Sequence, residues 1–452
     1  MAMAKPQVVD DEEYQRVHER AAAADVAKAP GVVCTRVPHP SRPGARCSTV
    51  QTVTATMNAI RKPGRQLRKD GIEIVTLESA SGYWRIWYYV LEAAGLTVQL
   101  VNAAQAGNLP GRPRTGRLDA MWLARLTEMG MLRASFVPPA PVRELRDYTR
   151  ARVRLVRERA RCYQQLEKLL EGALIKLSSV ASKLTTGSAR DMIAAMIAGE
   201  RDPQVLAALA RTRMKARHAA LVEALAGMSG DHHGELAQML LDQIAFPDGK
   251  IGQLATRIRQ RLSQIPGAWG ADAGGATGPG AGSEPDARVL PAAGRLAEIP
   301  GISPGLARSI IAGTGLDMSR FATAGHLVSR AGLCPATQQS GPRIRKDRKG
   351  QGDTWLRGYP GQAATAAART RTFPGERHAR IARRRGKARA QAATARSILV
   401  IIWHLLENPG ARFTDLGYDY YATRTGKDRR IRNHIRQIQA LGFDVTITAR
   451  AA

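Results

Sequence analysis

A serine hydroxyl stands at the start of a segment that is dense in cations. Ser340 precedes Gly341, and five basic residues follow within the next nine positions. Guanidinium and ammonium groups donate hydrogen bonds to phosphate oxygens, and glycine lets a backbone approach a ligand closely. The pattern would suit a hydroxyl held against a phosphodiester, but from these residues alone a solvated basic turn with an ordinary turn serine is the better explanation. The five cations are Arg343, Arg345, Lys346, Arg348 and Lys349.

Three acids in the first 120 residues stand where expected strands or helices begin or end: Asp25, Glu78 and Asp119. Carboxylates gathered at strand ends suit Mg²⁺, which prefers oxygen ligands and can act as a Lewis acid on a phosphodiester. Taken singly, each acid is better explained as a helix cap or a solvated surface charge. Spacing alone does not show that the three converge.

The charge balance indicates a polyanionic partner. The chain has 68 Lys and Arg against 38 Asp and Glu, a formal net charge of +30 and a pI of about 10.9. Neutralising phosphates releases counterions, which favours binding to nucleic acid. The longest apolar run, Ile398–Trp403 with the adjoining His404–Leu406, is shorter than the ~18 residues that cross a bilayer. The N-terminus lacks an apolar signal core, so we expect a soluble cytoplasmic protein without a membrane partner.

Length and cysteine usage limit the architecture. At 452 residues the chain exceeds a usual single core, so two or three domains are expected. Its four cysteines form no CxxC pair and no zinc spacing, which indicates reduced, structural thiols.

Residues 21–119 alternate between β-branched runs and helical patterns in the order β-β-β-α-β-α-β-α. This order matches a ribonuclease H-like sheet. Pro63 falls inside the expected helix Ala55–Lys69 and should break or kink it. The other expected elements are strands at Ala21–Ala24, Val32–Val37, Ser48–Val53, Ile72–Glu78 and Thr97–Val101, and helices at Tyr83–Ala94 and from Asp119.

The pattern changes to long amphipathic helices from Pro141 onward. Eight arginines lie between Arg143 and Arg161, behind an apolar stripe of period 3.5. A second stripe, Leu236–Leu262, is interrupted at Pro247. Two long helices that flank shorter ones predict a coiled-coil region, which is explained equally well by core packing or by a dimerisation arm.

Two further segments have features of nucleic-acid contacts. Pro300 and Gly301 form a turn between two helical stretches, typical of a helix-hairpin-helix that offers backbone N–H groups to phosphate, although a plain helix turn is the alternative. The run Arg383, Arg384 and Arg385 also suits a nucleic-acid backbone, although charge runs are often only solvated faces.

Several of these motifs occur in order in one known family. The chain resembles transposases of the insertion-sequence 110 family, the DEDD recombinases guided by a bridge RNA. The resemblance covers roughly residues 21–425 and depends on many motifs rather than on one. The motifs are Asp25–Lys28, Leu77–Ser79, Thr115–Ala120, Phe136–Pro139, Glu144–Asp147, Ile299–Ile302, Ala331–Pro335, Gln339–Gly341, Trp355–Arg357 and Ile398–His404.

The resemblance implies an α/β plus α protein. It would have a RuvC-like N-terminal domain of ribonuclease H fold, a coiled-coil helical region, and a mainly helical transposase domain with the helix-hairpin-helix-like motif. The expected boundaries are a flexible N-terminus at 1–20, the RuvC-like DEDD domain at 21–140, the coiled-coil region at 141–265, a flexible linker at 266–290, the transposase domain at 291–425 and a basic tail at 426–452.

The resemblance also implies a chemistry and a set of partners. The family's first, second and fourth acids fall on Asp25, Glu78 and Asp119, its metal is Mg²⁺, and its catalytic serine falls on Ser340. The implied reaction is transesterification of DNA through a phosphoserine intermediate. Implied partners are donor and target DNA, a structured guide RNA and further copies of the chain, as dimers that assemble to a tetramer, at the bacterial nucleoid.

The sequence departs from the family at one position. The third acid falls three residues before the fourth, and Gly116 stands there without a ligand atom. No Asp or Glu occurs from Val101 to Leu118 to replace it. Three functions therefore remain open: an active recombinase, a remnant that binds nucleic acid without chemistry, and a RuvC-type hydrolytic junction nuclease that uses the acids alone.

Overall fold

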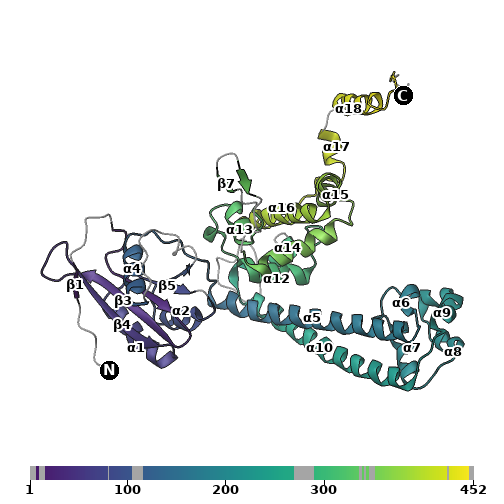
Figure 1. Cartoon of the computed structure of the whole chain (residues 1–452), viewed down its shortest axis with the longest axis horizontal. Coiled ribbons are helices and arrows are strands. Elements are labelled where there is room, and N and C mark those ends of the chain that lie inside the picture. Colours follow the sequence, from purple (N-terminus) through teal and green to yellow (C-terminus); the bar gives the residue numbers. More distant parts are fainter. Residues whose placement is uncertain are drawn as a thin grey trace, which may run out of the picture. The chain divides into compact units, whose positions relative to one another are not determined.

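The chain forms two compact units, Met1–Pro138 and Pro139–Ala452 (Figure 1). The structure is a computed structural model of the whole chain. Most of the expected linker and the loop cations Lys346, Arg348 and Lys349 lie outside the residues that it describes. The described residues are 7–9, 16–79, 81–103, 116–268, 290–334, 338–340, 343–345, 352–424 and 427–446.

The first unit is a six-stranded mixed sheet with the strand order β1-β4-β3-β2-β5-β6. Neighbouring strands among β2, β3 and β4 are antiparallel, and β5 runs parallel to both β2 and β6. The expected order of strands and helices is confirmed. β1 lies in the segment expected to be frayed, yet it pairs with β4. The elements are β1 (Gln7–Val9), β2 (Ala21–Val26), β3 (Pro30–Pro38), β4 (Arg46–Thr54), α1 (Met57–Lys69), β5 (Ile74–Ser79), α2 (Trp84–Ala93), β6 (Val98–Asn102) and α4 (Gly116–Glu128).

Strand β2 begins with four alanines and lies between β3 and β5, and Ala21–Ala24 are fully buried. Successive side chains of a strand point to opposite faces. Ala22 and Ala24 accordingly pack into the core with Ile60 of α1, whereas Ala23 packs with α4 on the other face. Small side chains let helices approach the strand closely from both sides.

Two expected helix interruptions are absent. α1 runs through Pro63, and the long helix α10 runs through Pro247. A proline removes one helical hydrogen bond, but each of these two lies on the buried face of its helix. Packing of Pro63 beside Ile60 and Leu67 offsets that loss, because tertiary packing of an amphipathic face contributes most of a helix's stability.

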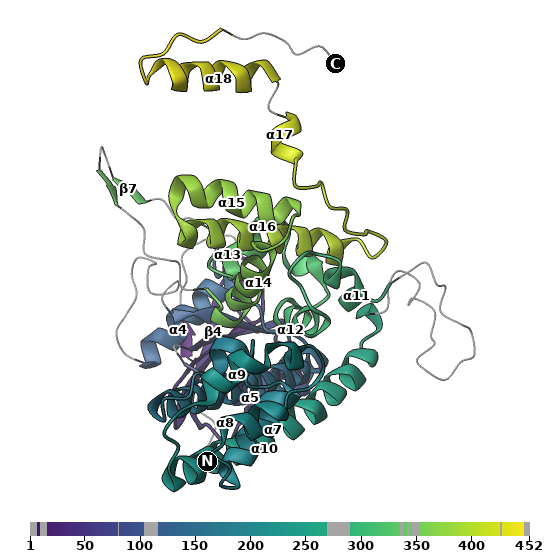
Figure 2. The ribbon, with the colours of Figure 1, turned by 90° about the vertical axis from the view of Figure 1, so that its right-hand side faces the viewer.

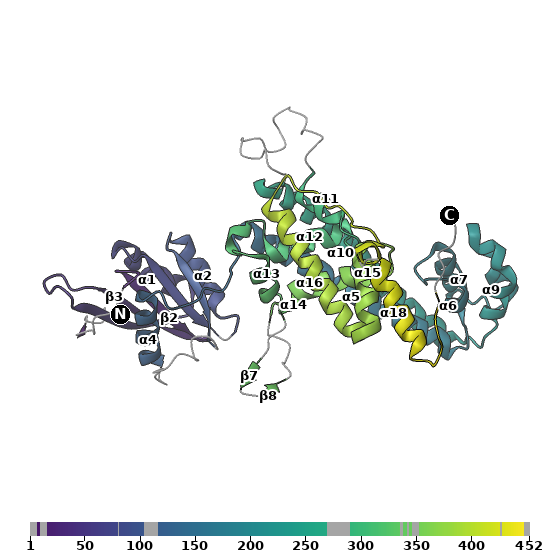
Figure 3. The ribbon, with the colours of Figure 1, turned by 90° about the horizontal axis from the view of Figure 1, so that it is seen from above.

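Two 33-residue helices, α5 and α10, pack along each other in the second unit (Figure 1). Arg159 pairs with Asp248, and Arg261 pairs with Glu144 at 3.4 Å, so the two helices are antiparallel. Shorter helices gather at their far end around a core that includes Met192 (Figure 3). These elements are α5 (Ala140–Gly172), α6 (Leu177–Val180), α7 (Gly187–Ile197), α8 (Pro203–Ala208), η1 (Thr212–Arg217), α9 (His218–Leu225), α10 (Asp231–Ser263) and η2 (Pro266–Ala268).

Helices α11, α13, α14 and α15 pack against α16, whose apolar run supplies the buried Ile398, Leu399 and Ile402. α15 and α16 lie side by side (Figure 2). No described helix combines the length and the apolar character that crossing a bilayer requires. The elements are α11 (Ala292–Ala297), α12 (Pro304–Thr314), η3 (Met318–Arg320), α13 (Ala324–Arg330), β7 (Gln338–Ser340), β8 (Arg343–Arg345), α14 (Thr354–Ala367), α15 (Phe373–Arg385), α16 (Lys387–Glu407), α17 (Tyr420–Arg424) and α18 (Lys427–Gln439).

A buried ion cluster holds the end of α4 against the sheet. The side chain of Glu128 is 0% exposed and accepts hydrogen bonds from Arg36 of β3, at 2.8 Å, and from Arg46 of β4. Arg46 also contacts Glu19 at 3.1 Å, a residue with a largely exposed side chain. A buried carboxylate shared by two buried guanidinium groups orients α4 on the sheet, because any other position would leave charge uncompensated.

We predict that Glu128→Gln destabilises the protein by about 3 kcal/mol or more, since it leaves two buried arginines without their carboxylate. The matched control is Glu19→Gln, which alters an exposed partner of Arg46 and should cost less than about 1 kcal/mol. Urea denaturation of the full chain measures both. Equal unfolding midpoints for the two variants would show that the cluster does not hold α4.

Candidate active site

Two of the three predicted acids meet at the ends of parallel strands. Asp25 of β2 and Glu78 of β5 are direct partners in the strand register. Partners in adjacent strands point to the same face, so both carboxylates lie on the face that α4 covers. The side chain of Glu78 is buried and that of Asp25 is half-buried. The register therefore brings the two acids together as a pair.

The first residue of α4 lies directly above this pair. A Cβ placed on Gly116 would be 3.7 Å from Oδ2 of Asp25 and 4.0 Å from Cγ2 of Val32. Those are ordinary van der Waals distances, so a side chain at position 116 has room and would begin beside the Asp25 carboxylate. Asp119 lies one turn along the same helix and is half-buried. The position of the missing family acid is thus part of the same site.

The donor set falls short of a full metal cage. Mg²⁺ takes oxygen ligands in near-octahedral geometry and is commonly bound by one or two carboxylates together with waters and phosphates. Asp25 and Glu78 fit that requirement as a pair. Across the described part of the chain, no group of three His, Cys, Asp or Glu side chains is placed to hold a metal ion. Gly116 is the position at which a third carboxylate would join the pair.

Hydrogen bonds between side chains hold α4 against the sheet beyond the acid pair. The Thr127 hydroxyl of α4 donates to the Thr76 hydroxyl of β5 at 2.8 Å, and Thr76 accepts from Gln99 of β6 at 2.6 Å. Thr76 lies two residues before Glu78 on the same strand face. These bonds tie the strand that carries Glu78 to the helix that carries Asp119.

Ser340 lies in a short antiparallel pair of strands. It is the last residue of β7 and pairs with Arg343, the first residue of β8 (Figure 3). Gly341 and Pro342, which join the two strands in the sequence, lie outside the described residues. Ser340 is thus the last residue of its strand. The side chains of this hairpin lie outside the described part of the structure.

The two ends of the segment that contains Ser340 are held tightly together. A Cβ on Gly352 would lie 2.2 Å from the backbone nitrogen of Gly332, so only glycine allows this approach. Next to it, the Asp353 N–H donates to the carbonyl of Arg330 at 2.9 Å. The segment therefore leaves and re-enters the helical unit at one point, between residues 330–332 and 352–353, which we call its root.

Pro300 and Gly301 form the expected turn between α11 and α12. Gly301 has φ +92°, and a Cβ there would lie 2.3 Å from the carbonyl oxygen of Ala363 in α14. The Ser303 hydroxyl accepts from the Leu306 N–H at 3.3 Å and caps α12. Packing against α14 accounts for the glycine, so its role in binding nucleic acid remains a prediction.

The basic run at the end of α15 also has a local role. Arg383, Arg384 and Arg385 occupy its last turn and are exposed, and Arg383 contacts Glu376 at 3.5 Å. Cations at a helix C-terminus interact favourably with the helix dipole. Binding of nucleic acid by this run remains a prediction.

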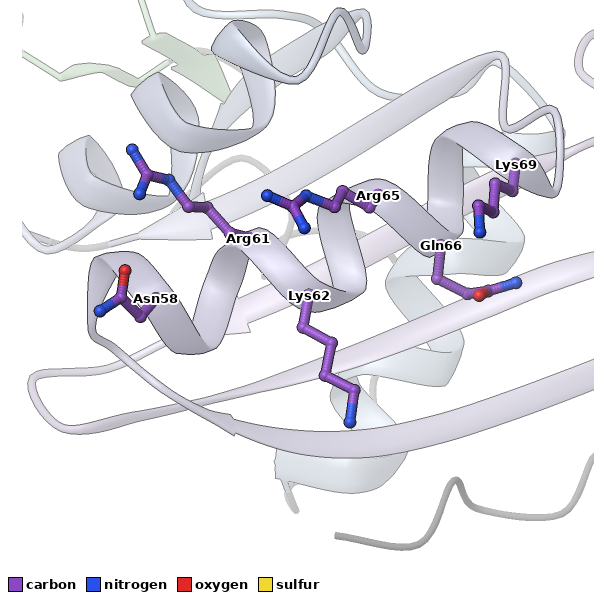
Figure 4. A pocket seen from close by; sticks show the side chains of 6 residues that line it. All are labelled: Asn58, Arg61, Lys62, Arg65, Gln66 and Lys69. Atoms are coloured by element: carbon purple, nitrogen blue, oxygen red, sulfur yellow. The ribbon is translucent and has the colours of Figure 1, made fainter.

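The sequence analysis missed a basic face on α1. Polar and cationic side chains line a hollow of about 370 Å³ on its solvent side, opposite the face that packs on the sheet (Figure 4). The signal was present as cations at i, i+1, i+4 and i+8 in a helix without an acid. The lining residues are Asn58, Arg61, Lys62, Arg65, Gln66 and Lys69.

Comparison with known families accounts for both units. Residues 22–175 match the DEDD transposase model of the IS110 type, and residues 293–380 match the model described as "Transposase IS116/IS110/IS902 family". The first match contains the acid pair with Gly116, and the second contains Ser340 with the Pro300 turn. A comparison with curated proteins finds no match.

A sheet with paired acids under α4, followed by a helical unit with a serine hairpin, defines a DNA transposase of the DEDD type. Within that class, the chain belongs to the insertion-sequence 110 family, as its motifs suggested. Transposases bind DNA and cleave and rejoin it, and DEDD transposase domains use divalent metal ions.

We predict that Gly116→Asp raises the affinity for Mn²⁺ or Mg²⁺ by roughly tenfold, because ligand charge count tunes the affinity of such sites. Isothermal titration calorimetry of the full chain measures the change. Gly82→Asp is the matched control, since it adds the same charge at an exposed glycine with open space around it. The same affinity in both variants would show that position 116 does not belong to a metal site.

Proposed function

We propose that this transposase exchanges DNA strands by transesterification, with the Ser340 hydroxyl as the nucleophile and a RuvC-like acid site in the N-terminal unit. The observation that carries the proposal is the register pairing of Asp25 with Glu78 beneath the start of α4. Two carboxylates at the ends of parallel strands, covered by a helix that contributes Asp119, are a suitable arrangement for phosphodiester chemistry.

The reaction conserves bonds at each step. The Ser340 oxygen forms a bond to phosphorus, the bond from phosphorus to the deoxyribose oxygen breaks, and the serine proton passes through a base to the leaving oxygen. The hydroxyl of a new DNA strand then reverses the process and releases the serine. Serine is a weak nucleophile and needs activation, and cations near the hairpin, such as Arg343 and Arg345, would neutralise the charge that develops on phosphate.

Asp25, Glu78 and Asp119 would together hold Mg²⁺. When bound, the ion supplies Lewis-acid polarisation of a phosphate oxygen. The carboxylates would hold the cation that faces the phosphodiester, and the ion pair of Glu128 with Arg36 keeps α4 in place above them.

The proposed partners are donor and target DNA, a structured guide RNA and further copies of the chain, as dimers that assemble to a tetramer. The net charge of +30 supports the nucleic-acid partners. Three exposed apolar side chains on one side of α10, Leu236, Met239 and Phe246, support its use as an assembly arm. Exposed apolar stripes of this kind are typical of protein interfaces.

A binding-only remnant is the second candidate, and Gly116 is the observation that favours it. A site with two paired carboxylates, in which glycine stands at the third position, would bind a metal ion more weakly than one with the full set. The basic surfaces would still bind nucleic acid.

The test is a covalent adduct. Purified full chain is incubated with its flanking noncoding RNA, paired DNA sites labelled at one end and Mg²⁺, and then resolved under denaturing conditions. We predict a protein–DNA adduct that Ser340→Ala reduces by about a thousandfold or more, with DNA binding unchanged. Ser329→Ala, an exposed serine of α13, is the matched control.

The other outcomes distinguish the alternatives. Cleavage without an adduct, and unaffected by Ser340→Ala, would assign the hydrolytic nuclease. An inactive wild-type chain that Gly116→Asp restores to strand exchange would assign the binding-only remnant.

A further inference from the structure

Three arginines of α5 converge on one aromatic ring. The guanidinium carbons of Arg150, Arg154 and Arg157 lie 5.4, 6.0 and 5.3 Å from the ring centroid of Trp355 in α14. Their spacing of i, i+4 and i+7 places them on one face of α5. Arg154 and Arg157 are exposed, and Trp355 is half-buried. The indole thus holds a row of guanidinium groups at the surface.

This row lies at the root of the segment that contains Ser340. Trp355 follows Asp353 by two residues, and Asp353 is bonded through its N–H to Arg330 at the other end of that segment. The Asp353 carboxylate also caps α14, where it accepts from the N–H groups of Trp355 and Leu356 at 2.9 and 3.1 Å. The position of Trp355 is therefore tied to the point where the hairpin leaves the helical unit.

Positive charge exceeds negative charge at this root. Oδ2 of Asp353 is 3.9 Å from Arg150 and 3.8 Å from Arg330. Arg146 donates to the carbonyls of Ala312 and Gly313 at 2.5 and 2.6 Å. Burial, with the charge of Arg330 beside it, lowers the pKa of Arg146 to about 10. The same region that disfavours the charged form of Arg146 thus contains several further guanidinium groups.

The exposed members of the row have no carboxylate of their own. In the part of the chain that the structure describes, neither Arg154 nor Arg157 is within 4.0 Å of an acid, and the acids nearby on α5, Asp147 and Glu158, form no ion pair. A guanidinium group stacked on an aromatic face still directs its N–H edges outward. Those edges are the groups that bind phosphate oxygens in pairs.

We infer that Arg150, Arg154 and Arg157, stacked on Trp355, bind the phosphodiester backbone of the DNA strand that enters beside the Ser340 hairpin. The choice of DNA rests on the proposed function, in which Ser340 attacks a DNA strand, and on the position of Trp355 next to the closure of the segment that contains Ser340. The three arginines act as positioning residues. They contact phosphates and not bases, so they hold a strand without selecting its sequence.

The experiment measures equilibrium binding of DNA to the full chain as a function of salt, in the Ser340→Ala background so that no covalent step intervenes. Each lost phosphate contact reduces the magnitude of the negative slope of log K against log salt by about 0.9. We expect Arg154→Gln with Arg157→Gln to reduce that magnitude by about 1.8, equally for DNA duplexes of different sequence. The control, Arg213→Gln with Lys215→Gln, removes the same charge from exposed positions in η1 and should leave the slope unchanged.

A second variant tests the aromatic platform. Trp355→Leu retains all three charges but removes the ring that orders them, so we expect weaker DNA binding with an unchanged salt slope. The inference would be overturned if the salt slope for DNA binding were the same in the α5 variant and in the η1 control. It would also be overturned if the α5 substitutions changed the salt slope for RNA binding but not for DNA binding. Failure of the proposed function would be distinguishable from this. In that case the wild-type chain would form no protein–DNA adduct, but the α5 substitutions would still change the salt slope of DNA binding.

Discussion

The buried carboxylate of Glu128 is the constraint on which the N-terminal unit depends. It compensates two arginines from neighbouring strands, and the resulting ion cluster fixes the C-terminal end of α4 on the sheet. Because a helix is rigid, fixing that end also determines where its first turn lies, above Asp25 and Glu78. The hydroxyl pair of Thr127 and Thr76 reinforces the same orientation. A buried ion cluster far from the acids thereby sets the geometry of the acid site.

The arginines of α5 show how one basic helix divides its charges among several tasks. Arg159 pairs with Asp248 and aligns α5 with α10, and Arg146 binds the last carbonyls of α12. Arg154 and Arg157 remain at the surface on Trp355. Arg146 and Arg159 are engaged by protein groups, whereas Arg154 and Arg157 are exposed and have no carboxylate partner among the described residues. The tertiary contacts therefore separate two groups of arginines on one helix.

Much of the sheet could be predicted because period-2 patterns and turn residues report on local structure. The strands β3 and β4 and the order of elements followed from such patterns, and the long helices of the second unit followed from apolar stripes of period 3.5. Pro63 and Pro247 misled the prediction, since local propensity indicated breaks where buried packing keeps each helix continuous. The basic face of α1 could also have been predicted, because its sequence has cations at helical spacing and no acid.

The sequence by itself determined the family of the protein, through acids at the ends of expected strands, a serine before a basic segment, a strongly positive chain and the motifs of one transposase family. Only the tertiary structure decided which of these residues meet. Strand register makes Asp25 and Glu78 neighbours across 53 residues of chain, and helix docking brings Gly116 to within side-chain reach of that pair. It also brings Trp355 to arginines about 200 positions earlier. Such contacts depend on packing between distant segments, which local sequence patterns do not encode.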